Sequence, residues 1–311
     1  RSLDEQRKRE EDRAIKDIAQ NSKSFFSFAN RRKNTLKSIG PLEVDGVTTS
    51  DPVEMANILA NEYVNAFSSP KQSEIVSDPS EFFIKLEEDG GFNDICITVD
   101  EVRNALKSFR RGASPGPDGI PADILIECSD ELAPALMELY QRSFDTGEIP
   151  EILKLSKIVP LHKGNGRQHA KNYRPISLTS HLGKGMEKVF KNHLVRYLEN
   201  HDLLNEHQHG FRSQRSTFSQ LVRHVEEVLS RLEDGGLVDV EYLDFARAFD
   251  KVDHGVLLSR IKSLNISGKA GIWISEFLTG RKQYVTIGGE SSDLFDIISG
   301  VPQGTVLRPI L

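Results

Sequence analysis

The chain has 311 residues, of which 38% are hydrophobic and 28% are charged, so its composition is that of a globular protein and not of a fibrous or disordered one. No stretch approaches the roughly 18 apolar residues of a membrane span, and the N-terminus is charged where a signal peptide is apolar, so we expect neither a membrane nor secretion. Cys96 and Cys128 are too few for a disulfide framework, which predicts free thiols inside the cell, with nucleus and cytoplasm left open.

The net charge of −6 hides an uneven distribution of charged residues. Residues 1–37 carry 11 basic and 6 acidic side chains, residues 38–101 carry 2 and 14, and residues 102–311 carry 27 and 26. Within the last part, Lys154–Arg196 holds ten basic residues and a single acid, Glu187. Such a segment favours phosphate binding, although a plain solvated face is the alternative interpretation.

The first 97 residues predict a mostly helical N-terminal extension that ends in an acidic linker. Residues 1–37 are typical of a charged helix followed by aromatic and basic side chains at 25–33, a combination that suits nucleic-acid binding and a plain solvated helix equally. Residues 51–67 repeat apolar side chains at helical spacing, so this second helix is expected to pack one face on a core. Residues 68–94 are polar, acidic and rich in Gly, Ser and Pro, as linkers are.

Residues 98–235 predict several helices and one short strand. Thr98 and Glu101 form a capping box that begins a helix, and Gly147 ends the next helix. The remaining elements expected in this part are a β-branched strand at 156–161 and amphipathic helices at 182–197 and 217–232.

Residues 236–311 predict further strands and helices. We expect a strand at 237–245, helices at 256–264 and 270–278, and a hairpin of 283–287 with 294–298 around Gly288 and Gly289. Strands and helices do not alternate regularly as they do in a parallel βαβ array, so the predicted fold class is α+β.

Asp244 ends the predicted strand on the same face as its apolar residues. Burying an unpaired carboxylate costs several kcal/mol, so an acid in such a place is usually paired or holds a metal. Asp250 and Asp253 follow closely and add carboxylates to the same turn. On spacing alone, a structural ion pair and a Mg²⁺ site are equal alternatives.

The segment Tyr242–His254, which reads YLDFARAFDKVDH, closely resembles the palm motif of reverse transcriptases from non-LTR (LINE-type) retrotransposons. Four further segments are similar to that family in the expected order, namely Ser114–Pro121, Asn172–Leu178, Gln208–Arg212 and Ser299–Leu307. One such motif is weak, whereas five in one order over residues 98–311 are a specific match.

The resemblance implies a right-hand polymerase fold of the α+β class. The fingers and the fingers/palm region are expected over 98–235 and a partial palm over 236–311, preceded by the extension of residues 1–97. The implied activity is that of an RNA-directed DNA polymerase, which joins deoxynucleoside triphosphates to a DNA primer on an RNA template by two-metal nucleotidyl transfer.

The resemblance also assigns roles around the implied catalytic residue, Asp244. Asp244 is expected to hold two Mg²⁺ ions with help from the backbone carbonyl of Phe245. Lys163 and Arg174 match residues that clamp the incoming triphosphate. Phe249 matches the residue that crowds the ribose 2′ position, and its alternative role is that of a core aromatic.

Two loops are implied to lie against nucleic acid. Gln303 and Gly304 match the loop beside the templating base, where a small residue lets the backbone approach. Gly116, Asp118 and Gly119 match a template contact, although the same residues form a common tight turn, and Arg212 completes the nucleic-acid set.

Two features depart from the family pattern. Arg308 stands where a glycine is expected, which strains the backbone if that position requires positive φ. The second acidic motif, an aromatic-Ala-Asp-Asp turn, is absent, since no Asp-Asp pair occurs. We therefore expect fingers and half a palm from a truncated or degenerate copy that is inactive as given. The alternatives are a catalytically dead nucleic-acid-binding remnant and a group II intron-type maturase, although Asn172–Leu178 favours the LINE type.

Overall fold

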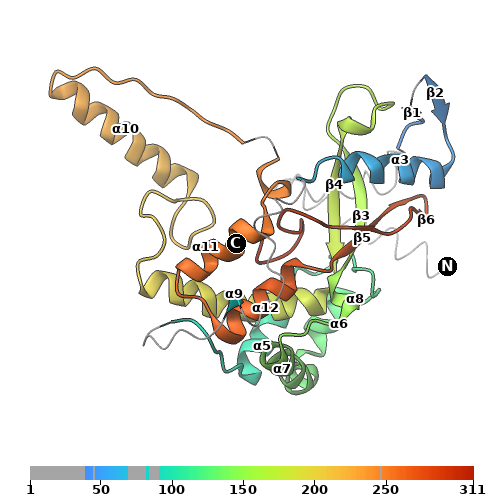
Figure 1. Ribbon diagram of the computed structural model, residues 1–311, viewed down its shortest axis with the longest axis horizontal. Helices are drawn as coiled ribbons and strands as arrows, with labels where there is room; N and C mark the ends of the chain where they lie inside the picture. Colours follow the sequence, from blue (N-terminus) through green and yellow to red (C-terminus); the bar gives the residue numbers. More distant parts are fainter. Residues whose placement is uncertain (1–38, 45, 69–81, 84–90, 246) are drawn as a thin grey trace, which may run out of the picture. The chain divides into compact units, whose positions relative to one another are not determined.

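The computed structural model describes residues 39–311 except 45, 69–81, 84–90 and 246 (Figure 1). The predicted helix within residues 1–37 and most of the predicted acidic linker lie outside the described residues. Residues 42–311 form one structural unit. The helix expected at 51–67 is present in this unit as α3 (Pro52–Val64), and it packs against the central sheet.

The central sheet is mixed. Its strands are β3 (Leu155–His162), β4 (Tyr173–Thr179), β5 (Lys282–Ile287), β6 (Glu290–Ser291) and β7 (Phe295–Asp296). The order is β4-β3-β5-β6, with β7 also on β5, and β3–β5 is the parallel pair. Ile158 lies opposite both Ser177 and Val285, so one buried row crosses three strands. The strand at 156–161 and the turn at Gly288–Gly289 are confirmed, whereas β4 was not predicted.

The other elements of the described unit are a small β1–β2 hairpin (Leu42–Val44, Val47–Thr49) and, besides α3, eight helices. They are α5 (Val99–Lys107), α6 (Ala122–Glu127), α7 (Ser129–Thr146), α8 (Glu151–Lys154), α9 (His181–Asn200), α10 (Thr217–Glu233), α11 (His254–Ser263) and α12 (Gly268–Leu278). Short 3₁₀ turns occur at Ala170–Asn172 and Ala248–Asp250. The mixed α and β composition agrees with the predicted class.

Local signals in the sequence explain where several helices begin and end. The Thr98–Glu101 capping box is formed, and it satisfies backbone N–H groups at the start of α5. Gly147 adopts the left-handed conformation that ends α7, as expected for a C-terminal glycine. These local features define the ends of α5 and α7, which lie side by side (Figure 1).

The core of this unit is centred on α9. The Phe190 ring stacks on Trp273 with a centroid distance of 4.3 Å, which joins α9 to α12. On another side of α9, the Tyr140 hydroxyl donates a hydrogen bond to the Leu182 carbonyl at 2.8 Å. Burying each such aromatic stabilises the fold by roughly 2–3 kcal/mol. The core therefore fixes α9 relative to α7 and α12, and α9 in turn supports the loops at its N-terminal end.

For the middle of the chain, one prediction is wrong in this structure and one is confirmed. Residues 237–245 form no strand, because no described strand lies beside them and a strand requires a hydrogen-bonded neighbour. The helix at 217–232 exists as α10, but none of its residues is buried. Figure 1 shows α10 apart from the other helices. A reciprocal capping box of Ser216 and Ser219 and its length of 17 residues stabilise it locally.

Candidate functional site

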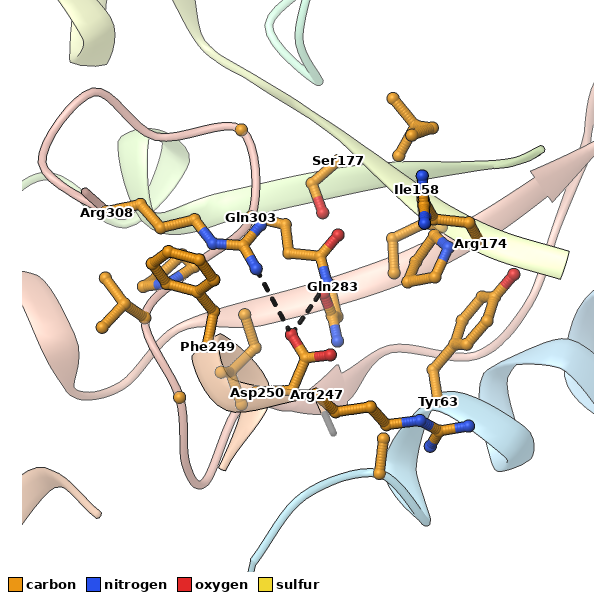
Figure 2. A pocket seen from close by; sticks show the side chains of 18 of the residues that line it. Tyr63, Ile158, Arg174, Ser177, Arg247, Phe249, Asp250, Gln283, Gln303 and Arg308 are labelled. Atoms are coloured by element: carbon orange, nitrogen blue, oxygen red, sulfur yellow. Dashed lines mark hydrogen bonds and ion pairs between the residues drawn. The ribbon is translucent and has the colours of Figure 1, made fainter. Parts of the chain in front are cut away.

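A cavity of about 700 Å³ lies where β3 and β4 meet the loop after β7 (Figure 2). All five residues predicted to bind the nucleotide line this cavity: Lys163, Arg174, Phe249, Gln303 and Gly304. They come from the β3–β4 hairpin, the turn before α11 and the loop at 299–309. Segments that are distant in the sequence therefore line the same cavity.

The β3–β4 hairpin supplies two cations to the cavity. Arg174 lies opposite Leu161 in the antiparallel pair, and its side chain is exposed. Lys163 directly follows β3, and its backbone N–H donates to the Asn172 carbonyl at 2.8 Å, which extends the pairing by one residue. The hairpin register thus brings the two positive side chains to the same end of the sheet, where they can attract phosphate.

Asp250 connects two residues that line the cavity, Gln303 and Arg308. Its Oδ1 accepts a hydrogen bond from Gln303 Nε2 at 2.8 Å and lies 3.8 Å from Arg308 Nη2. The Arg308 guanidinium lies over the Phe249 ring, 4.3 Å from its centre. Burial lowers the pKa of Arg308, and the negative charge of Asp250 opposes that shift. Figure 2 shows Phe249, Asp250, Gln303 and Arg308 as one cluster.

The loop between β7 and Arg308 passes close to other backbone segments at two glycines. A Cβ on Gly300 would lie 2.6 Å from the Phe249 carbonyl oxygen, and a Cβ on Gly304 would lie 2.3 Å from that of Ser177. Both glycines also have positive φ, at 82° and 81°. Glycine is required at both places because any side chain would push the loop away. Arg308 itself does not have positive φ, so the expected backbone strain is absent.

Asp244 and Phe245 lie outside this cavity. Both are exposed in the segment that forms no strand, so Asp244 does not end a buried apolar row as the sequence predicted. Asp253 accepts a hydrogen bond from the Val256 N–H at 3.1 Å and caps α11. Among the residues that the structure describes, no three His, Cys, Asp or Glu side chains are grouped closely enough to hold a metal ion.

The residues expected to contact the template lie elsewhere. A Cβ on Gly116 would lie 2.5 Å from the Ser180 nitrogen, and Asp118 accepts a hydrogen bond from Ser180 Oγ at 2.5 Å. Gly119 has a φ of 70° and open space around it. Arg212 pairs with Glu199 at 2.6 Å. Gly116 and Asp118 therefore fasten their loop to the start of α9, while Gly119 is accessible.

The basic segment Lys154–Arg196 divides into groups with different surroundings. Lys154 is buried and pairs with Glu276. Lys188 donates to Ser108 Oγ at 2.7 Å and lies over the Phe109 ring. Lys163 and Arg174 are the members of the segment that line the cavity. The predicted positive surface is thus concentrated on the hairpin and not spread evenly along the segment.

Sequence reasoning missed several residues of the cavity, among them Arg247 and Tyr63. Arg247 has a φ of 55° and its Nη2 lies 3.1 Å from Glu62 Oε1 of α3, so it ties the turn to the helix. Tyr63 of α3 also lines the cavity, and its hydroxyl is buried with no hydrogen-bond partner among the described residues. Burial raises the pKa of Tyr63. Its helical spacing indicated only a core residue, so no sequence signal revealed that Tyr63 lines the cavity.

Residues 161–311 match the family model described as reverse transcriptase (RNA-dependent DNA polymerase). This part of the chain belongs to that family, as the five motifs predicted, and the family's enzymes are RNA-directed DNA polymerases. The chain is 32% identical over 217 residues to an RNA-directed DNA polymerase from the mobile element jockey of Drosophila melanogaster. It is 31% identical over 216 residues to a probable RNA-directed DNA polymerase from transposon BS of the same species. Both relatives belong to non-LTR retrotransposons.

These matches cover 70% and 69% of the chain but only 24% of each relative, so the chain spans about a quarter of the length of these relatives. A shorter match, 34% identical over 159 residues, covers 51% of the chain and 17% of a probable RNA-directed DNA polymerase from the Drosophila melanogaster X-element. Cys96 and Cys128 are free, as predicted. None of the helices that the structure describes is long and apolar enough to cross a membrane.

Proposed function

We propose that this chain is the nucleotide- and template-binding part of a non-LTR retrotransposon reverse transcriptase. In this proposal residues 98–235 are the fingers and fingers/palm region, and residues 236–311 begin the palm of a right-hand polymerase. The proposal is carried by one observation, that all five residues predicted to bind the nucleotide line one cavity. Two of the five are cations, as a site for a triphosphate requires.

The proposed ligand of the cavity is a deoxynucleoside triphosphate. Lys163 and Arg174 bind its phosphates, since an Arg guanidinium and a Lys ammonium both suit phosphate oxygens. Phe249 lies beside the sugar and occupies the space that a 2′-hydroxyl needs. Gln303 and Gly304 form the wall next to the base, where Gln303 is oriented by its hydrogen bond to Asp250.

The family uses divalent metal ions, and the proposed Mg²⁺ ligands are the Asp244 carboxylate and the Phe245 backbone carbonyl. Mg²⁺ is commonly held by one or two carboxylates together with substrate phosphates, which an exposed Asp244 suits. Holding two ions requires more carboxylates than the described residues bring together. We therefore propose that the chain binds its substrates but extends no primer without further acidic residues.

Binding of dATP by the 311-residue chain tests the nucleotide site. Charge-assisted hydrogen bonds contribute roughly 1.5–3 kcal/mol each, so Lys163→Ala and Arg174→Ala are each expected to weaken binding by about tenfold or more. Arg196→Ala is the matched control, because Arg196 is exposed and lies outside the cavity. Equal dATP affinities in Lys163→Ala, Arg174→Ala and Arg196→Ala would overturn the proposed site.

Binding of RNA template and DNA primer is tested by its salt dependence. For single strands, each lost phosphate contact flattens the slope of log affinity against log salt by about 0.7. The double variant Lys163→Glu/Arg174→Glu should show this change, whereas Lys171→Glu/Arg196→Glu, made at exposed residues outside the cavity, should not. RNA binding without dATP binding would favour the catalytically dead binding remnant instead.

A further inference from the structure

Glu187 of α9 is a buried carboxylate outside the cavity that hydrogen-bonds the backbone of the cavity loop. Glu187 is only 4% exposed. Its Oε2 accepts two backbone hydrogen bonds, from Val306 N–H at 2.5 Å and from Leu307 N–H at 3.2 Å. Gln303, Gly304 and Arg308, which flank these two residues, line the cavity, whereas Glu187 does not.

The loop is held at two places. Gly304 lies against the Ser177 carbonyl of β4, so closely that a side chain would not fit. Two residues further on, Glu187 is the acceptor for two consecutive N–H groups. Leu307 is fully buried, so water cannot replace the carboxylate there. The turn between these supports is closed by Thr305 Oγ1, which donates to the Pro302 carbonyl at 2.7 Å.

We propose that Glu187 is a positioning residue, whose ionised carboxylate fixes the turn at 304–307 and thereby holds Gln303 and Gly304 in place for the nucleotide. The inference rests on the proposed nucleotide-binding function and adds a residue that does not touch the ligand. Gln303 is then fixed at both ends, by its hydrogen bond to Asp250 and by the turn that Glu187 anchors.

The charged groups that face Glu187 are Arg281, which precedes β5, and Lys184, which lies one helical turn away on α9. Arg281 is itself buried and donates to the Phe277 carbonyl at 3.1 Å. Burial raises the pKa of Glu187 to about 7, while Arg281, the two backbone N–H groups and Lys184 oppose the shift. Glu187 therefore changes its charge close to neutral pH.

The protonation state changes the strength with which the turn is held. A hydrogen bond to a carboxylate is roughly twice as strong as one to a neutral oxygen. Protonated Glu187 still offers an oxygen, so the turn loosens without being released. Glu187→Gln reproduces this neutral state at every pH, because the amide oxygen can still accept while the negative charge is gone.

The test compares wild type with Glu187→Gln, and uses Glu276→Gln as the control. Glu276 pairs with the buried Lys154 and does not contact the loop, so the control loses a comparable charge elsewhere. Two quantities are measured between pH 6 and pH 8: the Kd of dATP, and hydrogen exchange of the peptide that contains Val306 and Leu307, corrected for intrinsic rates.

Wild type and Glu276→Gln should bind dATP about 3- to 10-fold more tightly at pH 8 than at pH 6, beyond any change from the nucleotide's own phosphate. Glu187→Gln should remove this difference and bind at pH 8 as wild type does at pH 6. Exchange of the Val306 and Leu307 amides should be faster in Glu187→Gln at pH 8, and faster in wild type at pH 6 than at pH 8.

The two measurements separate the failure of this inference from the failure of the nucleotide site. If wild type binds no dATP at any pH, the proposed function fails, while amide exchange still reports whether Glu187 holds the turn. Unchanged exchange in folded Glu187→Gln overturns the positioning role. Faster exchange with an unchanged Kd overturns it too, because the turn would then not control the cavity. Should Glu187→Gln not fold, pH-independent exchange in wild type is the overturning result.

Discussion

Replacing Gly116 by alanine tests whether the loop at 114–119 is fastened to α9 or free to contact a template. A Cβ at this position would lie 2.5 Å from the Ser180 nitrogen and 2.6 Å from the Thr179 carbonyl carbon. Both are backbone atoms between β4 and α9, so neither can rotate away. The loop must shift instead, and the shift would break the hydrogen bond that Ser180 Oγ donates to Asp118.

The magnitude follows from two contributions. Inserting an extra carbon into a packed contact costs roughly 1–3 kcal/mol. Ser180 also caps α9 by accepting from the Gly183 N–H, and disturbing such a cap costs about 1 kcal/mol. Gly116→Ala should therefore lower the free energy of unfolding by about 2–4 kcal/mol. Gly119→Ala is the matched control, because it meets no atom within 4 Å and costs only its positive φ, roughly 1 kcal/mol.

Urea unfolding followed by circular dichroism measures both variants. Wild type should be the most stable, followed by Gly119→Ala and then Gly116→Ala. The slope of the free energy of unfolding against urea concentration should not change. RNA affinity adds a second readout. If Gly119 contacts the template, Gly119→Ala should bind RNA more weakly although it is nearly as stable as wild type. A Gly116→Ala protein as stable as Gly119→Ala would refute the close packing on Ser180.

Three further outcomes follow from the cluster around the cavity and from Glu187. Phe249→Ala should raise the affinity for ATP relative to dATP. It should lower the free energy of unfolding by less than the roughly 3–5 kcal/mol expected for a core aromatic, because Phe249 is only half-buried. An unfolded variant would indicate a core role. Arg308→Ala should cost about 1 kcal/mol in urea unfolding through loss of the Phe249 and Asp250 contacts, and an unchanged midpoint would contradict them. Because the pKa of Glu187 is raised from 4.5 to about 7, its contribution to stability is present below pH 4.5 and lost as pH rises to about 7. Relative to Glu187→Gln, wild type should lose about 3 kcal/mol of unfolding free energy over that window, and parallel pH curves would refute the shift.

The elements that the sequence predicted well are those that local chemistry determines. Thr98 with Glu101 and the left-handed Gly147 define helix ends without reference to the rest of the chain. The prediction of a strand at 237–245 is wrong because alternating apolar residues form a strand only beside a hydrogen-bonded neighbour. No strand among the described residues pairs with this segment. In the same way α10 has the expected apolar face, yet periodicity alone cannot say whether another element covers it.

The candidate site was predictable only through the family resemblance. Nothing in composition or spacing shows that Lys163 and Gln303 share a cavity, since their proximity depends on the parallel pairing of β3 with β5. The same long-range contacts explain what was missed. Tyr63 and Arg247 enter the cavity because α3 packs on the sheet and Arg247 pairs with Glu62. Glu187 was noticed only as the single acid in a basic segment.

Asparagine variants of Asp244 and Asp250 distinguish a residue that binds a metal ion from one that supports the cavity. Asp250 is partly buried and accepts from Gln303, so Asp250→Asn should weaken dATP binding with or without Mg²⁺, because the charge that holds Gln303 and Arg308 is lost. Asp244 is exposed, so Asp244→Asn should change stability by less than about 0.5 kcal/mol and leave metal-free dATP binding unchanged.

The difference should emerge when Mg²⁺ is added. A carboxylate that shares the ion with substrate phosphates stabilises the bound nucleotide, so Mg²⁺ should tighten dATP binding in wild type and in Asp250→Asn but not in Asp244→Asn. Isothermal titration of dATP with and without the metal measures this, with Asp239→Asn as a control at another exposed acid of the same segment. If Mg²⁺ tightens binding equally in Asp244→Asn, the metal is held by the phosphates alone, and Asp244 is not a ligand in this chain.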